Sequence, residues 1–509
     1  MTSSPHPVDL LVIGGGINGT AIARDAAGRG LSVVLCEKDD LARHTSSAST
    51  KLIHGGLRYL EYYEFRLVRE ALIEREVLLR SAPHIIWPMR FVLPYDKGQN
   101  GKGMRPAWML RLGLLLYDNL GGRELLPGTK SVDLREPPHA GVLEARLKTG
   151  FEYSDCWVED ARLVVLNALD AQHRGADIRV GIEVTALEAH PEGYRATLSD
   201  GSDLVARGVV NAAGPWVDEV LFKIKRDSND TAVRLVKGSH IVTRRLFPGD
   251  HAYIFQNADD RIVFAIPYER DFTLIGTTDV PWEAAPGPME ISAAETDYLC
   301  AAASEYFEDD ITAADVVWSY AGVRPLYDDK NENASAVTRD YVLDIDELSG
   351  SRPVLSIYGG KITTSRKLAE HAMDKLADWY GEAGDGWTAE AILPGGDIPL
   401  TAGPANDFDG FVHEQAARYP GVPGDVLLHL CRAYGTRVTL VLGDGPDIDL
   451  GRRFGAQLTE AEARYLMAHE WARTADDILF RRTKQGLHLG AEARAAFENW
   501  FREHWRARD

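Results

Sequence analysis

A glycine-rich turn near the start of the chain constrains the fold more than any other feature of the sequence. The turn follows an apolar run, Val8–Ile13, that is typical of a buried strand, and it leads into a helical pattern from about Asn18 to Arg29. A second apolar strand is predicted at Ser32–Glu37. Strand, helix and strand in this order form a βαβ unit, so we predict a doubly wound parallel sheet in this part of the chain.

The glycines of this turn have the spacing of an adenine-dinucleotide site. Gly14, Gly16 and Gly19 supply the pattern G-x-G-x-x-G. The first permits the tight turn, the second lets backbone amides approach a pyrophosphate, and the third lets helix and strand pack closely. Glu37 ends the second strand, where an acidic residue binds the ribose. The pattern alone is common to NAD and FAD sites.

A later glycine-ended strand favours a flavin. Similar strands are predicted at Gly208–Gly214 and Pro353–Gly360, so we expect a nucleotide domain built from non-contiguous segments. A helical run follows the second of these strands through Ala377, and its positive end could lie under a flavin ring, where it would stabilise the reduced ring. A helix capped by Thr363 or Thr364 explains the same residues, and both explanations can hold together. Because the glycine-ended strand and its helix suit a flavin, we predict FAD as the cofactor.

The rest of the chain divides into a β-rich part and a helical part. Alternating runs dominate Val233–Val280, and helical spacing follows Pro394, for example at Glu460–Glu470 and Ala491–Arg506. The predicted fold class is α/β (α+β overall): a Rossmann-like FAD-binding domain, a β-sheet domain that caps the substrate, and an all-helical C-terminal domain. The predicted limits are 1–80, 150–232 and 325–393 for the FAD domain, 81–149 and 233–324 for the cap, and 394–509 for the C-terminal domain.

Composition excludes several classes of function. The 56 Lys and Arg residues against 76 Asp and Glu give a net charge of −20, which repels polyanions, so we expect no nucleic-acid partner. The four cysteines are far apart and predict neither a metal site nor a disulfide framework, which fits a reducing cytosol. We expect no signal peptide and no spanning helix, because no apolar run approaches ~18 residues.

Several motifs closely resemble those of the FAD-dependent glycerol-3-phosphate dehydrogenases, and together they cover nearly the whole chain. The motifs are Thr45–Ser49 (TSSAS), Lys51–Glu61 (KLIHGGLRYLE), Phe151–Trp157 (FEYSDCW), Lys237–Ile241 (KGSHI), Gly276–Asp279 (GTTD), Gly322–Leu326 (GVRPL), Gly359–Thr364 (GGKITT) and Arg481–Gly486 (RRTKQG).

The resemblance implies oxidation of glycerol 3-phosphate to dihydroxyacetone phosphate, with quinone as the usual acceptor. A related group uses oxygen, and this alternative stays open. The resemblance also implies that the cofactor is contacted by further residues beside the fingerprint and Glu37: Thr45, Ser46, Ser49, Gly55, Val184, Gly214, Gly360, Lys361, Ile362 and Thr363.

A phosphorylated substrate needs cations. By resemblance, Arg324, Arg58 and Lys361 line the substrate pocket together with Tyr59. A guanidinium matches a phosphate with two parallel hydrogen bonds, and a lysine adds a compact charge. Lys361 could instead serve the pyrimidine carbonyl of the flavin.

Oxidation of an alcohol also needs a group that takes the hydroxyl proton, and histidine fits best near neutral pH. We prefer His240, because its segment is expected to face the flavin from the far side, and we keep His54 as the weaker alternative that contacts the flavin. Thr278 is a candidate substrate contact, although a turn-forming role explains its motif equally well.

A quinone lies in lipid, so we predict peripheral association with the cytoplasmic face of the cell membrane. The segment Arg105–Tyr117 combines apolar residues with Trp108 and Tyr117, which suit the headgroup layer, and with the nearby cations Lys102, Arg105 and Arg111. A buried helix packed on the cap domain is the alternative. The oligomeric state, including a homodimer, stays open.

Two rival functions remain at this point. Another flavin oxidase, acting on an amine or hydroxy acid, would share the glycine pattern but would not need a cluster of phosphate-binding cations. A redox-sensing or RNA-modifying nucleotide-binding module without turnover is disfavoured, because the chain is acidic and has no basic stretch with interleaved aromatic residues.

Overall fold

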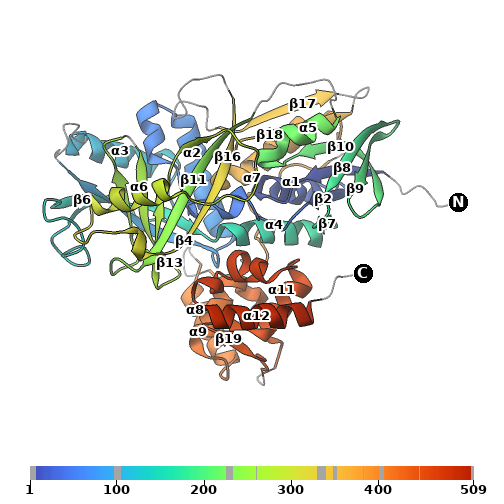
Figure 1. Ribbon diagram of the computed structural model, residues 1–509. Helices are drawn as coiled ribbons and strands as arrows, with labels where there is room; N and C mark the ends of the chain where they lie inside the picture. The colour runs from blue at the N-terminus through green and yellow to red at the C-terminus, as the bar shows by residue number, and fades with distance from the viewer. Residues whose placement is uncertain are drawn as a thin grey trace.

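The computed structural model describes residues 7–96, 105–224, 233–259, 261–328, 340–347, 352–381, 383–400, 406–445 and 448–505. Figure 1 shows three parts: a nucleotide-type α/β part on the right, a second sheet on the left, and a helical C-terminal part below them. The predicted fold class is confirmed.

An eight-stranded sheet with the order β17-β18-β10-β1-β2-β7 forms the α/β part, and a β8-β9 hairpin extends it from β10. Its inner strands are parallel. The strands are β1 (Val8–Ile13), β2 (Val33–Glu37), β7 (Asp177–Val180), β8 (Val184–His190), β9 (Gly193–Leu198), β10 (Asp203–Asn211), β17 (Val342–Glu347) and β18 (Pro353–Tyr358).

Alternate residues of the central strands enter two different cores, because a parallel sheet is buried on both faces. Leu10 and Val12 of β1 pack under a layer of helices, whereas Leu11 and Ile13 pack against the β8-β9 hairpin. The helices of the first face are α1 (Ile17–Gly28), α4 (Asp160–His173) and α7 (Ser365–Lys375), and α5 (Val217–Ile224) lies on the other face. The helix predicted to run through Ala377 thus ends earlier, at Lys375.

A ten-stranded sheet forms the second part. Its strands are β3 (Leu52–Ile53), β4 (Ile86–Tyr95), β5 (Lys130–Asp133), β6 (Thr149–Val158), β11 (Val233–Arg244), β12 (Ala252–Gln256), β13 (Ile262–Tyr268), β14 (Phe272–Gly276), β15 (Val280–Trp282) and β16 (Val316–Tyr327). Helix α6 (Ala293–Ser304) packs on one face, and α2 (Phe65–Ser81) and α3 (Ala107–Leu120) pack on the other.

The second sheet includes a strand that the predicted limits assign to the FAD domain. Strand β6 pairs with β4 along its whole length, from Thr149 opposite Tyr95 to Val158 opposite Ile86. Nothing local in the sequence encodes this pairing between distant segments, which is why the limits set at residue 150 do not follow the sheet. The domain limits themselves stay a prediction.

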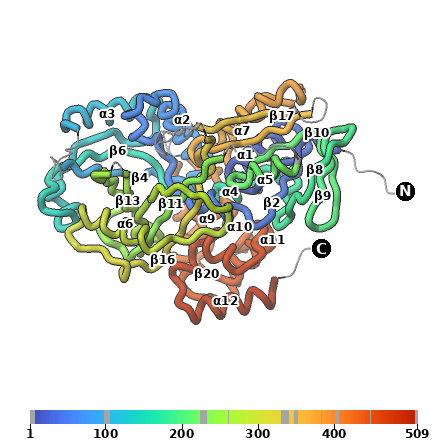
Figure 2. Tube along the Cα trace, turned by 45° about the horizontal axis from the view of Figure 1, so that its top comes forward, coloured from blue at the N-terminus to red at the C-terminus, as the bar shows by residue number. Residues whose placement is uncertain are grey.

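The C-terminal part is helical apart from a small hairpin of β19 (Arg453–Gly455) and β20 (Leu458–Thr459). Its helices are α8 (Phe408–Arg418), α9 (Gly424–Tyr434), α10 (Val438–Leu442), α11 (Glu460–His469), α12 (Ala491–His504) and a π-helical segment, Asp477–Arg482. Helix α4 lies between this part and the eight-stranded sheet (Figure 1), and Figure 2 shows the C-terminal part from a second side.

Within the described ranges, every helix is too short or too polar to cross a membrane. All four cysteines are buried as free thiols.

Candidate active site

A cavity opens beyond the carboxyl ends of β1, β2, β10 and β18, where parallel α/β sheets bind their ligands. The space between its walls, counted together with its open mouth, is about 1060 Å³. Predicted cofactor residues along its wall are Gly14, Gly16, Glu37, Thr45, Ser46, Val184, Gly214 and Gly360. The other predicted ones, Gly19, Ser49, Gly55, Lys361, Ile362 and Thr363, lie outside this wall.

The glycine turn forms a cradle that side chains would fill. Gly14 has a φ of +111°, and a Cβ there would lie 2.5 Å from the carbonyl oxygen of Ala212. A Cβ on Gly19 would lie 2.0 Å from the carbonyl oxygen of Gly14, which confirms its role in close packing. Ser46 accepts a hydrogen bond from the first amide of α1, that of Ile17, at 3.0 Å. The backbone at this turn thus fits the close approach of a pyrophosphate.

Glu37 lies inside the cavity wall at the end of β2. Its carboxylate oxygens accept the amide protons of Gly15 at 2.6 Å and Asp39 at 2.7 Å. Burial raises the pKa of Glu37 to about 7, although these two hydrogen bonds oppose the shift. Its contact with a ribose stays a prediction.

Asn18 offers a polar atom that the sequence did not single out. Its side-chain amide donates to the carbonyl oxygen of Gly359 at 3.1 Å and so joins α1 to the turn after β18. Its Oδ1 atom is buried without a hydrogen-bond partner among the described residues. An acceptor in this position fits a ligand that brings its own donor into the cavity.

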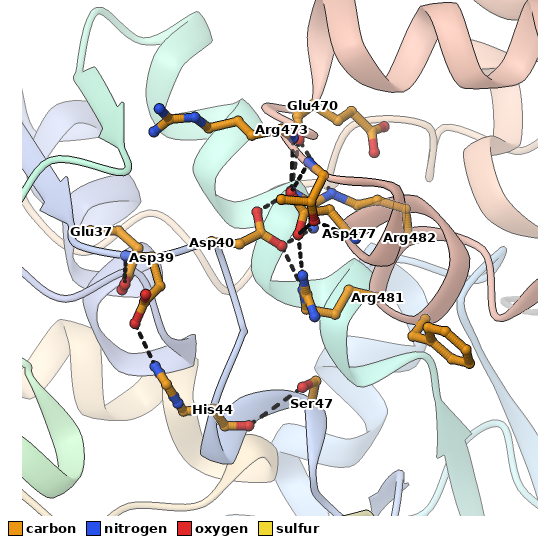
Figure 3. A network of polar contacts seen from close by, with 12 residues as sticks. Glu37, Asp39, Asp40, His44, Ser47, Glu470, Arg473, Asp477, Arg481 and Arg482 are labelled. Carbon is orange, nitrogen blue, oxygen red and sulfur yellow. Dashed lines mark hydrogen bonds and ion pairs between the residues drawn. The ribbon is translucent and has the colours of Figure 1, made fainter. Parts of the chain in front are cut away.

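Aromatic and basic side chains that the sequence reasoning missed form another wall. The ammonium of Lys38 lies 3.8 Å from the ring centroid of Trp216, and the ring of His44 lies 4.5 Å from it. His44 also contacts Asp39 at 2.8 Å, as Figure 3 shows beside Glu37. Trp216 follows the predicted strand that ends at Gly214. Its place just beyond a glycine-ended strand could have identified it as a cavity residue from the sequence.

His240 lies in β11 on the face of the ten-stranded sheet that meets residues 45–50. Its Nε2 atom is 2.9 Å from the hydroxyl of Thr50, and its ring stacks on Tyr320 at 4.8 Å. The Nδ1 atom is buried and has no hydrogen-bond partner among the described residues. Burial, together with Arg324 and Lys51, keeps the pKa of His240 well below its usual value, so the ring is neutral at pH 7.

Arg324 lies on β16, next to β11, and its guanidinium is held in place. It contacts the carboxylate of Asp279 and donates to the hydroxyl of Thr277 at 3.2 Å. A Cβ on Gly238 would lie 2.5 Å from its Nη2 atom, so the glycine of β11 leaves room for the arginine. The positive charge of Arg324 is one of the causes of the lowered pKa of His240, so the structure brings these two predicted site residues near each other.

The remaining predicted substrate residues form a second group around the turn after β3. The ammonium of Lys361 lies 3.9 Å from the ring centroid of Tyr59, and Arg58 donates to the hydroxyl of Tyr62 at 3.0 Å. The amide of His54 donates to the hydroxyl of Thr363 at 3.3 Å. Burial, aided by the cations of Lys361 and Arg75, lowers the pKa of His54 to about 4.

Thr278 points toward helix α6 rather than toward His240. Its hydroxyl accepts the amide proton of Ser239 and donates to Glu295, both at 2.9 Å. Glu295 also binds the ammonium of Lys237 at 2.8 Å. These contacts give Thr278 a clear structural role, and its contact with substrate stays a prediction.

Two families match the chain in succession. The family described as FAD dependent oxidoreductase matches residues 9–366, and the C-terminal domain of alpha-glycerophosphate oxidase matches residues 387–502.

Individual relatives are similar over almost their whole length. D-erythritol 1-phosphate dehydrogenase of Brucella abortus is 51% identical over 505 residues, and aerobic glycerol-3-phosphate dehydrogenase of Escherichia coli is 47% identical over 507; each alignment covers 98% of both chains. The solved structure of the glycerol-3-phosphate dehydrogenase from Bacillus halodurans complexed with FAD has 27% identity and a TM-score of 0.70, and the match covers 98% of this chain and 95% of that one.

Proposed function

Because this chain belongs to the family of FAD-dependent oxidoreductases, we propose that it oxidises sn-glycerol 3-phosphate to dihydroxyacetone phosphate and passes the electrons to a membrane quinone. The observation that carries the proposal is the placement of a neutral histidine, His240, and a fixed arginine, Arg324, on the sheet face that meets residues 45–50. His240 can take a proton from an alcohol, and Arg324 can bind a phosphate.

FAD is the cofactor, and its cavity is lined by the glycine turn, Glu37 and the ends of β10 and β18. When bound, FAD supplies the acceptor for the hydride that leaves C2 of the substrate. The unpartnered Oδ1 of Asn18 and the open backbone at Gly14 and Gly16 fit such a ligand.

Arg324 binds the substrate phosphate in this proposal. A guanidinium has five N–H donors, and the contacts with Asp279 and Thr277 leave donors available while they fix the plane of the group. Arg58 and Lys361 add positive charge from the second group. Tyr59 supports Lys361 through its ring.

His240 accepts the hydroxyl proton as the C2–H bond breaks. Its Nε2 is engaged by Thr50, so Nδ1 is the nitrogen left for the substrate. His54, with a pKa of about 4, is also neutral and is the second candidate for this role.

A second candidate substrate is D-erythritol 1-phosphate. The relative with that name is 51% identical to this chain, and two relatives named for glycerol 3-phosphate, from Escherichia coli and Pseudomonas aeruginosa, are 47% and 49% identical. Both substrates combine a phosphate with a secondary alcohol, so the same cation and the same base would serve either. Space beside the alcohol, rather than chemistry, would separate them.

Helix α3 is the surface we propose for docking on the inner face of the cell membrane. Leu114 and Tyr117 pack inward, but Trp108, Leu112 and Leu115 are 66%, 58% and 57% exposed. One face of α3 thus packs on the ten-stranded sheet, as the alternative of a packed helix expects, and the other face is exposed. Lys102 lies outside the described residues, and of the other cations predicted to help, both Arg105 and Arg111 are exposed.

The apolar surface of α3 continues beyond the helix. Tyr62, Tyr63 and Phe65, at the start of α2, are 51%, 78% and 41% exposed. Tyr62 and Tyr63 lie at the end of the turn Leu57–Tyr62, which contacts α3 and also carries Arg58 and Tyr59, and Phe65 is the first residue of α2. A bilayer held against this surface would lie near the second group of substrate residues, where a quinone could collect electrons. Figures 1 and 2 place α3 at the end of the molecule away from the C-terminal part.

The test is anaerobic mixing of the yellow holoprotein with glycerol 3-phosphate, D-erythritol 1-phosphate or glycerol. We expect rapid bleaching with a phosphorylated polyol and none with glycerol. The faster of the two phosphates identifies the substrate. A soluble quinone should then restore the colour faster than oxygen does; equal bleaching by glycerol would contradict the phosphate site, and faster recovery with oxygen would contradict the acceptor.

A further inference from the structure

Residues 470–484 of the C-terminal part, which we call the C-terminal clamp, lie against loops that build the half of the cavity containing Glu37. Figure 3 shows Arg481 and Arg482 of the clamp beside Asp40, which lies three positions beyond Glu37. The clamp contacts two loops, 37–46 and 180–184, whose neighbouring residues form the cavity wall. Neither Asp40 nor the clamp arginines form part of that wall.

The first contact is a buried ion cluster centred on Asp40. Arg482 binds both carboxylate oxygens, with its Nη1 and Nη2 atoms at 2.8 and 2.7 Å, and Arg481 binds through Nε at 2.6 Å. The side chain of Arg482 has no exposed surface, and that of Asp40 is 5% exposed. Well-aligned hydrogen bonds between the two charged groups offset the cost of burying them. Removal of one partner would leave the other as an uncompensated buried charge.

The second contact holds the loop after β7. Arg473 donates to the carbonyl oxygen of Val180 at 2.6 Å. Its guanidinium also covers Gly181, where a Cβ would lie 1.4 Å from Nη1. The amide of Ile182 donates to the carbonyl oxygen of Glu37 at 2.8 Å, so the two loops are also joined to each other.

Hydrogen bonds and an ion pair also connect the residues of the clamp to one another. Asp477 is buried and accepts the backbone amides of Arg473 and Thr474, each at 2.8 Å, and it also contacts Arg481. Arg482 donates from Nη2 to the carbonyl oxygen of Glu470 at 2.8 Å. One carboxylate thus connects the arginine that holds one loop to the arginine that holds the other.

We propose that the C-terminal clamp sets the affinity for FAD by holding loops 37–46 and 180–184 in the binding conformation, without touching the cofactor. Without the clamp these loops would have to be ordered when FAD binds, and that ordering would weaken binding. Because coupling is reciprocal, FAD should in turn tighten the clamp. The proposal depends on the FAD site and not on the identity of the substrate.

The test compares FAD binding to apoprotein of Asp40→Asn and Arg473→Met with wild type, by titration of flavin fluorescence. We expect the dissociation constant to rise about tenfold or more in each variant, since allosteric couplings are typically ~5–150-fold. Wild-type affinity in both variants would overturn the proposal.

The matched control is Glu470→Gln. Glu470 lies within the clamp, but the substitution leaves the carbonyl oxygen that Arg482 contacts in place. Its side chain pairs with Arg162 of α4 at 3.0 Å and so joins the C-terminal part to the α/β part at a residue of neither cavity loop. We expect a lower thermal midpoint and an unchanged dissociation constant for FAD. A loss of FAD affinity equal to that of Asp40→Asn would assign the effect to general docking of the C-terminal part and overturn the proposal.

Hydrogen exchange on the wild-type protein gives a readout that does not depend on whether the variants fold. Amides of residues 473–484 should exchange more slowly after FAD is added to apoprotein, although none of these residues lines the cavity. Equal exchange with and without FAD would contradict the reciprocal coupling.

Discussion

The role proposed for Arg324 depends on two parallel hydrogen bonds to a phosphate, which lysine cannot reproduce. In Arg324→Lys we expect kcat/KM for the phosphorylated substrate to fall about 10- to 100-fold, because a hydrogen bond to a charged group contributes ~1.5–3 kcal/mol. Steady-state kinetics with a soluble dye measure this. Arg261→Lys, on an exposed ion pair with Asp259, is the control and should retain wild-type kinetics.

His240 is expected to act mainly in the transition state. In His240→Ala the rate of flavin reduction should fall about 10²- to 10⁴-fold, the range of general-base catalysis, while substrate binding is largely retained. Stopped-flow reduction separates the two effects, and His413→Ala, an exposed histidine of α8, serves as the control. An unchanged rate would move the role to His54.

Glu295 gives a pH-dependent test of the buried cluster that holds Thr278. Its hydrogen bonds with Lys237, Ser292 and Ser239 lower the pKa of Glu295 to about 2, against the opposing effect of burial. A depressed carboxyl pKa contributes stability that is present above the unfolded-state pKa of about 4.5 and is lost as the pH falls toward 2.

We therefore expect Glu295→Gln to lose about 3 kcal/mol of stability at pH 7 and less at pH 4. The thermal midpoints of the two proteins at both pH values measure this. If the two thermal midpoints differ as much at pH 4 as at pH 7, the charge of Glu295 is not responsible for the lost stability. Retained substrate affinity in the variant at pH 7 would favour the structural role of Thr278.

At the scale of elements, helix α3 offers the clearest prediction. Leu112→Asp with Leu115→Asp should abolish co-sedimentation with liposomes and leave dye-linked activity unchanged, because both side chains are more than half exposed. Leu440→Asp, on the 53% exposed leucine of α10, is the matched control and should still sediment. Undiminished sedimentation of the double variant would move the docking surface elsewhere.

The sequence predicted local elements well and their long-range partners less well. Val8–Ile13 was predicted with the bounds of β1, because an apolar run that ends at a glycine turn is a local signal. The pairing of β6 with β4 could not be predicted, since it joins segments that are far apart in the chain. The contact of Lys38 with Trp216 at the cavity could not be predicted for the same reason, because the two residues meet only after β2 and β10 have taken their places in the sheet.

At the scale of the whole molecule, FAD should behave as a non-covalent part of the fold. Acid or heat precipitation should release yellow flavin and leave a colourless pellet, because no attachment motif is predicted. Free FAD at about 100 times its dissociation constant should stabilise apoprotein by about 2.7 kcal/mol, which a thermal shift measures. A pellet that stays yellow would contradict non-covalent binding.

The order of strands in the eight-stranded sheet has a consequence for synthesis on the ribosome. Strand β1 pairs with β10, and β10 pairs with β18. Strand β10 is complete only when Asn211 has been synthesised, and β18 only when Tyr358 has been synthesised. At about 5–20 residues per second, the ribosome needs on the order of 20 to 70 s to deliver them. During this time the apolar edge of the nascent sheet is unpaired, and chaperones have a long interval in which to bind it.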